Sequence, residues 1–344
     1  MAENDTSARA VVWFEPADAR LASPTPVTFD RPIHSSFTEP TGAQMVPPNG
    51  PTCRGHEHGA ASWNETPVLP PKSKGTDMDP KSEITLHTGT KMPVLGLGTW
   101  QLTNDTAGTV AAALELGYRM IDTSGDYGTQ PGIGDGINRS GIERADLYLV
   151  TKVEETGDAC QATRKNLDEL QLDYADLMLI HRPPRTGAGE NLWRGLIRAK
   201  EDGLAKDIGV SNYSVELIET LIDATGEVPA VNQIEWSPFG YSDDMLRYAT
   251  EKQIVIQAYS PLTRTRRLRN ETLIGIASKY GKSPAQALIR WNLQRGTVPL
   301  PKANRRQHLE ENIDVFYFEI GEEDLEILNR LNEHYSSLGM LSYA

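Results

Sequence analysis

The stretch Tyr118-Arg-Met-Ile-Asp122 decides the fold, because it is a short, mostly apolar run that ends on a carboxylate. Two further stretches have the same design: Leu147-Tyr-Leu-Val-Thr-Lys152 and Leu177-Met-Leu-Ile-His181. Short apolar runs of this kind are typical of buried strands, and the strands of a parallel barrel have their carboxyl ends at one mouth. We therefore expect the three polar residues to meet at that mouth, together with Tyr127, which lies five positions beyond Asp122.

Short apolar runs alternate with helical patterns from Glu83 onward. The runs span residues 94–97, 118–121, 147–151, 177–180, 207–210, 230–234, 254–258 and 298–300. Amphipathic stretches between them include residues 108–116, 159–170, 190–199, 215–224, 242–250 and 273–280. This alternation predicts an α/β fold, a (β/α)8 TIM barrel. An open doubly wound sheet is the competing layout, but it usually carries a glycine fingerprint, and Gly132-Ile-Gly-Asp-Gly136 lacks the spacing and follows no strand.

Further elements are expected at both ends of the barrel. Ile84-Thr-Leu86 and Lys91-Met92 flank the turn Thr88-Gly-Thr90, which predicts an N-terminal β-hairpin that plugs the barrel floor. Ser283-Pro284 begins another helix, which ends before a glycine, and residues 322–333 predict a last helix on the outside.

Residues 1–80 have a different composition from the rest. More than half of the chain's 22 prolines lie there, among Thr, Ser, Asn and charged residues. Such a segment buries too little apolar surface to offset its ordering entropy, so we expect a mostly disordered extension before a barrel domain over residues 81–344. Cys53, His56 and His58 lack a second ligand pair and regular spacing, so no metal site is expected.

The composition excludes several classes of partner. The net charge of −13 and the pI near 5.1 argue against nucleic acid and against an anionic membrane surface. No apolar run approaches the roughly 18 residues that a membrane span needs, and the first residues lack the pattern of a signal peptide. Two cysteines are too few for a disulfide framework. We expect a soluble, cytoplasmic monomer that acts on a small molecule.

The residues expected at the mouth suit proton donation. A free tyrosine has a pKa of about 10 and releases its proton reluctantly near neutral pH. The charge of Lys152 would favour the phenolate of Tyr127, and Asp122 would hold the ammonium. His181 offers a donor for a carbonyl oxygen that gains negative charge. Each residue alone has a structural explanation, such as a helix cap or a solvated strand end, but their conjunction predicts protonation of a carbonyl oxygen.

The chain resembles the aldo-keto reductase superfamily from about Ile84 to Glu333. The resemblance rests on the motifs Met92-Pro-Val-Leu-Gly-Leu-Gly-Thr-Trp100, Gly117-Tyr-Arg-Met-Ile-Asp-Thr123, Leu149-Val-Thr-Lys152, Leu179-Ile-His-Arg-Pro183, Ile208-Gly-Val-Ser-Asn212, Val231-Asn-Gln233, Ala258-Tyr-Ser-Pro-Leu262 and Leu300-Pro-Lys302. It implies an NAD(P)H-dependent carbonyl reductase in which Tyr127 is the general acid and Lys152 lowers its pKa. Asp122 would anchor Lys152, and His181 would orient the substrate.

The resemblance also implies a cofactor site. The residues that match cofactor contacts are Gly98, Thr99, Trp100, Asp122, Ser211, Asn212, Gln233, Tyr259, Ser260, Leu262, Arg264, Lys302, Ala303, Arg305, His308, Glu311 and Asn312. Ser211, Asn212 and Gln233 would bind the nicotinamide carboxamide, and the ring of Tyr259 would stack on the nicotinamide. The arginine-rich loop over residues 263–270 would lie beside the pyrophosphate.

The loop after the last strand distinguishes NADPH from NADH. Lys302 matches the family's phosphate-binding lysine, whereas Ala303 replaces a hydroxyl residue and His308 replaces an arginine. Arg305 and Arg306 lie close enough in sequence to compensate, so we expect NADPH rather than NADH.

The substrate site is expected to include Trp100, Tyr127, His181 and Trp236, with part of the loop over residues 182–193. That loop is short, and little sequence follows the last helix. These features favour a small aldehyde, dicarbonyl or keto acid over a steroid.

Two other functions are compatible with such a barrel. Related barrels serve as non-catalytic subunits that sense nicotinamide nucleotides, and the N-terminal extension would then bind a partner. A sugar-phosphate isomerase or aldolase would use Lys152 alone and leave Tyr127 and Asp122 without a purpose. The presence of all four chemically matched residues favours the reductase.

Overall fold

The computed structural model describes residues 78–102, 104–155, 157–339, 341 and 343. The predicted N-terminal extension lies almost wholly outside the described residues, as do Cys53, His56 and His58. Its disorder and its boundary with the barrel therefore stay predictions.

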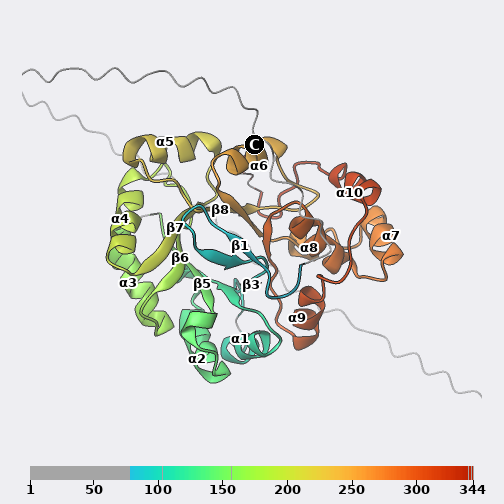
Figure 1. Ribbon diagram of the computed structural model, residues 1–344, viewed down its shortest axis with the longest axis horizontal. Helices are drawn as coiled ribbons and strands as arrows, with labels where there is room; N and C mark the ends of the chain where they lie inside the picture. Colours follow the sequence, from blue (N-terminus) through green and yellow to red (C-terminus); the bar gives the residue numbers. More distant parts are fainter. Residues whose placement is uncertain (1–77, 103, 156, 340, 342, 344) are drawn as a thin grey trace, which may run out of the picture. The chain divides into compact units, whose positions relative to one another are not determined.

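Eight parallel strands form a barrel in which each strand pairs with the next one along the chain. The strands are β3 (Leu97–Gly98), β4 (Met120–Asp122), β5 (Tyr148–Val153), β6 (Ala175–Ile180), β7 (Ala205–Ser211), β8 (Val231–Glu235), β9 (Val255–Tyr259) and β10 (Val298–Leu300). The N–H of Gly96 donates to the carbonyl of Pro299, and the N–H of Gly98 donates to that of Pro301, both at 3.1 Å. These bonds join the first strand to the last, so the predicted TIM barrel is confirmed (Figure 1).

A β-hairpin closes one end of the barrel. Strand β1 (Glu83–Thr85) pairs antiparallel with β2 (Lys91–Pro93), and Ile84 faces Met92 in the register. Leu86 and Met92 are buried in the same apolar cluster as Met120 and Val150 of the barrel strands. In Figure 1, β1 lies across the middle of the ring of strands, as expected for a plug.

Helices surround the strands (Figure 1). They are α1 (Thr106–Glu115), α2 (Gln130–Ser140), α3 (Ala159–Leu170), α4 (Glu190–Glu201), α5 (Val215–Thr225), α6 (Asp243–Glu251), α7 (Glu271–Lys279), α8 (Pro284–Gln294), α9 (Arg306–Ile313) and α10 (Glu322–Asn329). Short 3-10 turns lie at η1 (Gly125–Tyr127), η2 (Arg144–Asp146) and η3 (Thr263–Thr265). Side-chain caps explain several starts: Asp158 caps α3, Ser214 caps α5, and Ser283 forms a capping box with Gln286 in α8.

Some boundaries differ from the expectation. The first strand is displaced from residues 94–97 to Leu97–Gly98, the two residues that pair with Ile121 and Asp122 of β4. Helix α9 was not predicted, since only Leu309 and Asn312 are buried in its eight residues and the apolar period is weak. Helix α10 ends at Asn329 rather than residue 333.

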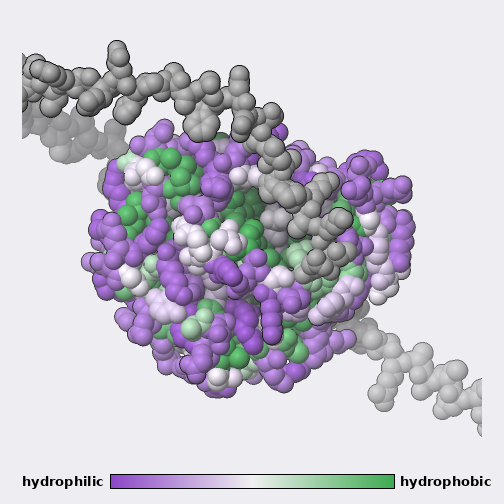
Figure 2. All heavy atoms as spheres, viewed as in Figure 1, coloured by the Kyte–Doolittle hydropathy of each residue, from purple (hydrophilic) through white to green (hydrophobic). Residues whose placement is uncertain are grey.

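The outer surface is polar and the interior apolar. Every residue of β5, β6 and β8 is buried, as expected for strands covered by helices. Figure 2 shows hydrophilic side chains over most of the visible face. None of the described helices has the length and apolar character to cross a bilayer.

Candidate active site

Four polar side chains meet at the carboxyl ends of β4, β5 and β6. Asp122 is the last residue of β4, Lys152 lies next to the end of β5, and His181 directly follows β6. Tyr127 ends the 3-10 turn that follows β4. The rings of Tyr127 and His181 lie 5.7 Å apart in an edge-to-face arrangement, and the Nζ of Lys152 lies 5.2 Å from the centre of the Tyr127 ring. The structure therefore brings the four predicted catalytic residues together.

Lys152 and Asp122 form a buried ion pair. The ammonium donates to both carboxylate oxygens of Asp122 at 3.0 and 2.9 Å, and to the carbonyl of Thr123 at 2.7 Å. Lys152 is 1% exposed and Asp122 is 4% exposed. Asn166 of α3 donates to the carbonyl of Lys152 at 2.7 Å, which fixes the end of the strand. The ion pair is thus held in a fixed position beneath the mouth.

The phenol of Tyr127 is a weak acid in this environment. Burial raises its pKa well above the ordinary value, the charges of Asp122 and Asp126 raise it further, and the charge of Arg182 offsets part of the effect. This direction differs from the expectation that Lys152 lowers the pKa. The reason is that burial and the charges of Asp122 and Asp126 outweigh the positive charge near the phenol, and that the ammonium of Lys152 donates its hydrogen bonds to Asp122 and Thr123 while it faces the ring of Tyr127. The phenol therefore holds its proton at neutral pH.

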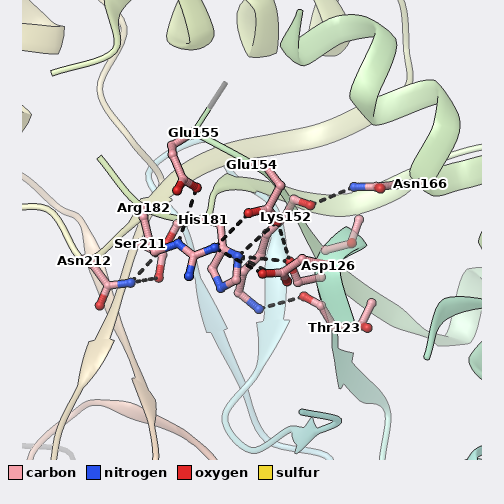
Figure 3. Close-up of polar contacts among 12 residues, drawn as sticks. Thr123, Asp126, Lys152, Glu154, Glu155, Asn166, His181, Arg182, Ser211 and Asn212 are labelled. Carbon is pink, nitrogen blue, oxygen red and sulfur yellow. Dashed lines mark hydrogen bonds and ion pairs between the residues drawn. The ribbon is translucent and has the colours of Figure 1, made fainter. Parts of the chain in front are cut away.

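A group of charged residues lies beside His181, and we call it the acidic cluster: Asp126, Glu154 and Glu155 with Arg182. The Nδ1 of His181 lies 3.2 Å from Glu154 and 3.4 Å from Asp126, and also 3.2 Å from the hydroxyl of Ser124. Arg182 donates to Glu154 at 2.9 Å, to Asp126 at 3.1 Å and to Glu155 at 3.4 Å. Figure 3 shows the guanidinium among these carboxylates.

Sequence reasoning missed the acidic cluster, although a signal was present. Asp126 directly precedes Tyr127, and Glu154 and Glu155 follow Lys152 by two and three residues, so the same strand-end argument applies to them. Asp126, Glu154 and His181 also have the spacing of a metal-binding group, with ligand atoms within 4.8 Å of one another. Because Arg182 already donates to both carboxylates, the arrangement is better explained as an ion-pair network.

A cavity of about 750 Å³ opens above the mouth. Its lining includes every residue predicted to bind the cofactor and three of the four catalytic residues, Asp122, Tyr127 and His181. Lys152 lies beneath them and does not line it. Arg182, Thr265 and Leu268 come from the two loops expected at the site, whereas lining residues outside the predicted sets include Gln101, Asp126, Pro261, Pro301, Asn304 and Leu338.

The ends of β7, β8 and β9 are joined by hydrogen bonds. Asn212 donates to the carbonyl of His181 and to the hydroxyl of Ser211, both at 3.1 Å, and accepts from the Tyr259 hydroxyl at 2.8 Å. Its φ of 64° is left-handed, which asparagine tolerates better than most residues. The hydroxyl of Ser211 donates to the carbonyl of Gln233 at 2.8 Å. These contacts hold the amide of Asn212 and the ring of Tyr259 in place.

Another part of the cavity contains two cationic side chains. They are Lys302 and Arg305, and neither side chain forms an ion pair with a described residue. Partial burial lowers the pKa of Lys302, an effect that a bound anion would oppose. The guanidinium of Arg264 lies 4.0 Å above the ring of Trp100, so these two residues connect the loops after β9 and β3. Gly98 allows the end of β3 to lie close to the end of β10, since a Cβ at Gly98 would lie 2.7 Å from the carbonyl oxygen of Leu300.

Other arginines near this region have other partners. Arg306 pairs with Glu115 at 2.8 Å and with Glu310 at 3.1 Å, so it does not line the cavity as the sequence suggested. In the arginine-rich loop, Arg264 is the arginine that lines the cavity, whereas Arg267 pairs with Glu333.

Trp236 does not line the cavity, contrary to the prediction that it contacts substrate. Its side chain is fully buried and packs against Tyr241 at 5.9 Å and Tyr343 at 5.5 Å between ring centres. The segment after α10 covers it, because Ser336 and Ser337 donate to Glu235 at the end of β8 at 2.6 and 2.8 Å. Leu338 of this segment reaches the cavity instead.

The closed barrel and the charged groups at its mouth are those of an oxidoreductase of the aldo-keto reductase type. The model of the Aldo/keto reductase family matches residues 94–333, so the chain belongs to this family. It is 43% identical over 256 residues to an aldo-keto reductase of Mycobacterium tuberculosis, covering 73% of this chain and 91% of the relative. An aldo-keto reductase of Mycobacterium leprae is 40% identical over 259 residues, with the same two coverages.

Solved structures agree with this assignment. The crystal structure of an aldo/keto reductase from Brucella melitensis has a TM-score of 0.69 and 38% identity, covering 73% of this chain and 99% of that one. An aldo-keto reductase of Bombyx mori, solved in complex with NADP, has a TM-score of 0.71 and 31% identity, covering 74% of this chain and 94% of that one.

Proposed function

We propose that the protein reduces the carbonyl group of a small aldehyde, dicarbonyl or keto acid to an alcohol, with NADPH as the cofactor. The observation that carries the proposal is the buried Lys152–Asp122 pair beneath Tyr127 and His181, in the cavity that Gln233 and Tyr259 also line. The proposal takes a small-molecule carbonyl as the partner and a monomer in the cytoplasm as the acting form.

The residues of the cavity fit a nicotinamide dinucleotide phosphate. Gln233 donates from Nε2 to Asp122 and Gln257, which leaves its carbonyl oxygen as an acceptor for a carboxamide. Ser211 and Asn212 would hold the same group, and Tyr259 would form a flat wall beside it. Lys302, Arg305 and Arg264 are cations placed for phosphates, and the Lys302–Arg305 end favours NADPH over NADH. When bound, the cofactor supplies a hydride to the carbonyl carbon.

Tyr127 supplies the proton. Its raised pKa keeps the phenol protonated until the substrate oxygen gains charge, and an alkoxide is a stronger base than a phenolate. The proton then passes from the Tyr127 oxygen to the substrate oxygen. Lys152, beneath the ring, and Arg182, at the cavity edge, stabilise the phenolate that remains, and His181 holds the carbonyl oxygen in place.

Substitution of Tyr127 tests this function. Oxidation of NADPH is followed with a panel of small aldehydes and dicarbonyls, using the full chain and Tyr127→Phe. We expect turnover in the parent and a loss of at least about a thousandfold in the variant, with NADPH affinity retained. Undiminished turnover in Tyr127→Phe would overturn the role of the phenol. Tight NADPH binding by the parent without turnover of any carbonyl would instead support a nucleotide sensor.

A further inference from the structure

The acidic cluster beside the substrate end of the cavity carries more negative than positive charge. Three carboxylates of the acidic cluster surround one guanidinium, that of Arg182. Partial burial raises the pKa of Glu154, but hydrogen bonds from His181 and Arg182 outweigh this effect and hold the pKa at about 2. Glu154 is therefore ionised throughout the physiological range.

Arg182 is the cation that a substrate carboxylate would need, yet its charge is already shared among three carboxylates of the protein. Nη2 donates to both Glu154 and Asp126, and Nε donates to Glu155. Burial lowers the pKa of the guanidinium, and the hydrogen bond to Glu154 with the charges of Glu155 and Asp126 raises it by more. The positive charge of the guanidinium is thus outnumbered by the three carboxylates around it, so the acidic cluster keeps a net negative charge.

The acidic cluster lies close to the position of the reacting carbonyl. Asp126 and Arg182 line the cavity, and Asp126 is the residue before Tyr127. The Nδ1 of His181 lies within 3.4 Å of carboxylate oxygens of both Asp126 and Glu154. A carbonyl held between Tyr127 and His181 therefore places its nearest substituents beside these carboxylates, while the unpaired cations Lys302 and Arg305 lie at the cofactor end.

We infer that Asp126 and Glu154 select substrates by charge, so that the enzyme accepts neutral or cationic carbonyl compounds and rejects those with a carboxylate near the carbonyl. The inference rests on the proposed function and narrows it, because it removes keto acids from the substrate class. A substrate carboxylate close to these carboxylates in a partly desolvated site is repelled, whereas a neutral substituent experiences no such repulsion.

A matched set of aldehydes tests the selection. The probes are 4-carboxybenzaldehyde, its neutral methyl ester and the cationic 4-formyl-N,N,N-trimethylanilinium, each reduced with NADPH near neutral pH at low ionic strength. We expect kcat/KM for the ester to exceed that for the carboxylate by at least about tenfold, and the cation to equal or exceed the ester. Reduction of the ester with an equal or faster reduction of the carboxylate would overturn the inference. Failure to reduce any probe or simple aldehyde would count against the proposed function itself.

Neutral isosteric variants identify the residues responsible. In Asp126→Asn/Glu154→Gln, Arg182 loses two charged partners, and the ratio of ester to carboxylate kcat/KM should fall at least about tenfold. A ratio is used because loss of the contact to His181 lowers both rates. Glu251→Gln, at the end of α6 and the opposite end of the barrel, is the control for total charge, and its ratio should match the parent. An unchanged ratio in the double variant would contradict the assignment.

Binding gives a readout that does not depend on catalysis. Calorimetry of 4-(hydroxymethyl)benzoate and its methyl ester, with NADP⁺ present, should show weaker binding of the carboxylate to the parent. The difference should shrink in the double variant and at high salt, since screening weakens the repulsion. Equal affinities in the parent at low salt would refute charge selection.

Discussion

Gln233 donates a hydrogen bond of 2.8 Å from Nε2 to the Oδ2 of Asp122, and so joins the predicted cofactor site to the buried ion pair of the catalytic group. Asp122 thereby accepts from Lys152 and Gln233 on the same oxygen. The two sites share one polar network, so a change at Gln233 should affect both.

Gln233→Leu tests this connection. The substitution removes the acceptor for the carboxamide and a donor to the carboxylate of Asp122, so we expect NADPH affinity to fall about tenfold and kcat to fall as well. Fluorescence titration and steady-state kinetics measure the two effects. A change confined to the dissociation constant would show that the hydrogen bond to Asp122 does not contribute to catalysis.

Lys152→Met should destabilise the fold strongly. Removing one partner leaves the carboxylate of Asp122 buried without its counter-charge, which costs about 3–5 kcal/mol in comparable buried pairs. Urea unfolding gives the free energy. The control is Arg164→Met, which breaks the exposed pair with Asp202 and should cost less than about 1 kcal/mol. Equal losses in the two variants would argue against a desolvated pair.

The contact between Trp100 and Arg264 should slow the release of NADPH from the cavity. Because the guanidinium stacks 4.0 Å from the ring centre across the cavity, Trp100→Ala should raise the NADPH dissociation constant by about three- to tenfold. Trp100→Phe, which keeps a smaller ring, should fall between the parent and the alanine variant. Stopped-flow release of NADPH measures the effect, and unchanged release in Trp100→Ala would exclude this contact as a restraint.

The pH dependence of reduction should reflect the raised pKa of Tyr127. The acid form is the active one, and burial with the charges of Asp122 and Asp126 keeps the phenol protonated above its ordinary range. The alkaline loss of kcat/KM should therefore lie above about pH 10, the value for a free tyrosine. A loss near pH 8 that disappears in a variant of Tyr127 would contradict the raised pKa.

Much of the barrel could be predicted because local sequence determines its strands, and the cofactor residues of the cavity lining could be predicted from the resemblance to the family. Buried parallel strands read as apolar runs, and the polar residue after each run must lie at the mouth, which places Asp122, Lys152 and His181. Helix α9 carries no such signal because only two of its residues are buried, and β3 carries none because it is only two residues long.

What the sequence could not show is which charged residues pair. Arg182 binds carboxylates 27 to 56 positions away, and Arg306 pairs with Glu115 across 191 positions. These contacts form only when the barrel closes, and they determine which cationic side chains can bind a phosphate or an anionic substrate. Trp236 is predicted at the substrate site, but the segment after α10 covers its side chain.

The most direct test of the central claim uses NADPH carrying deuterium at both C4 positions of the nicotinamide. The full chain is incubated with the neutral ester aldehyde in ordinary water, and the alcohol is examined by mass spectrometry. Reduction by hydride from the cofactor and a proton from Tyr127 predicts one deuterium on the carbinol carbon, with product formation lost in Tyr127→Phe. Alcohol without deuterium, or no alcohol from any carbonyl despite bound NADPH, would contradict the proposed reaction.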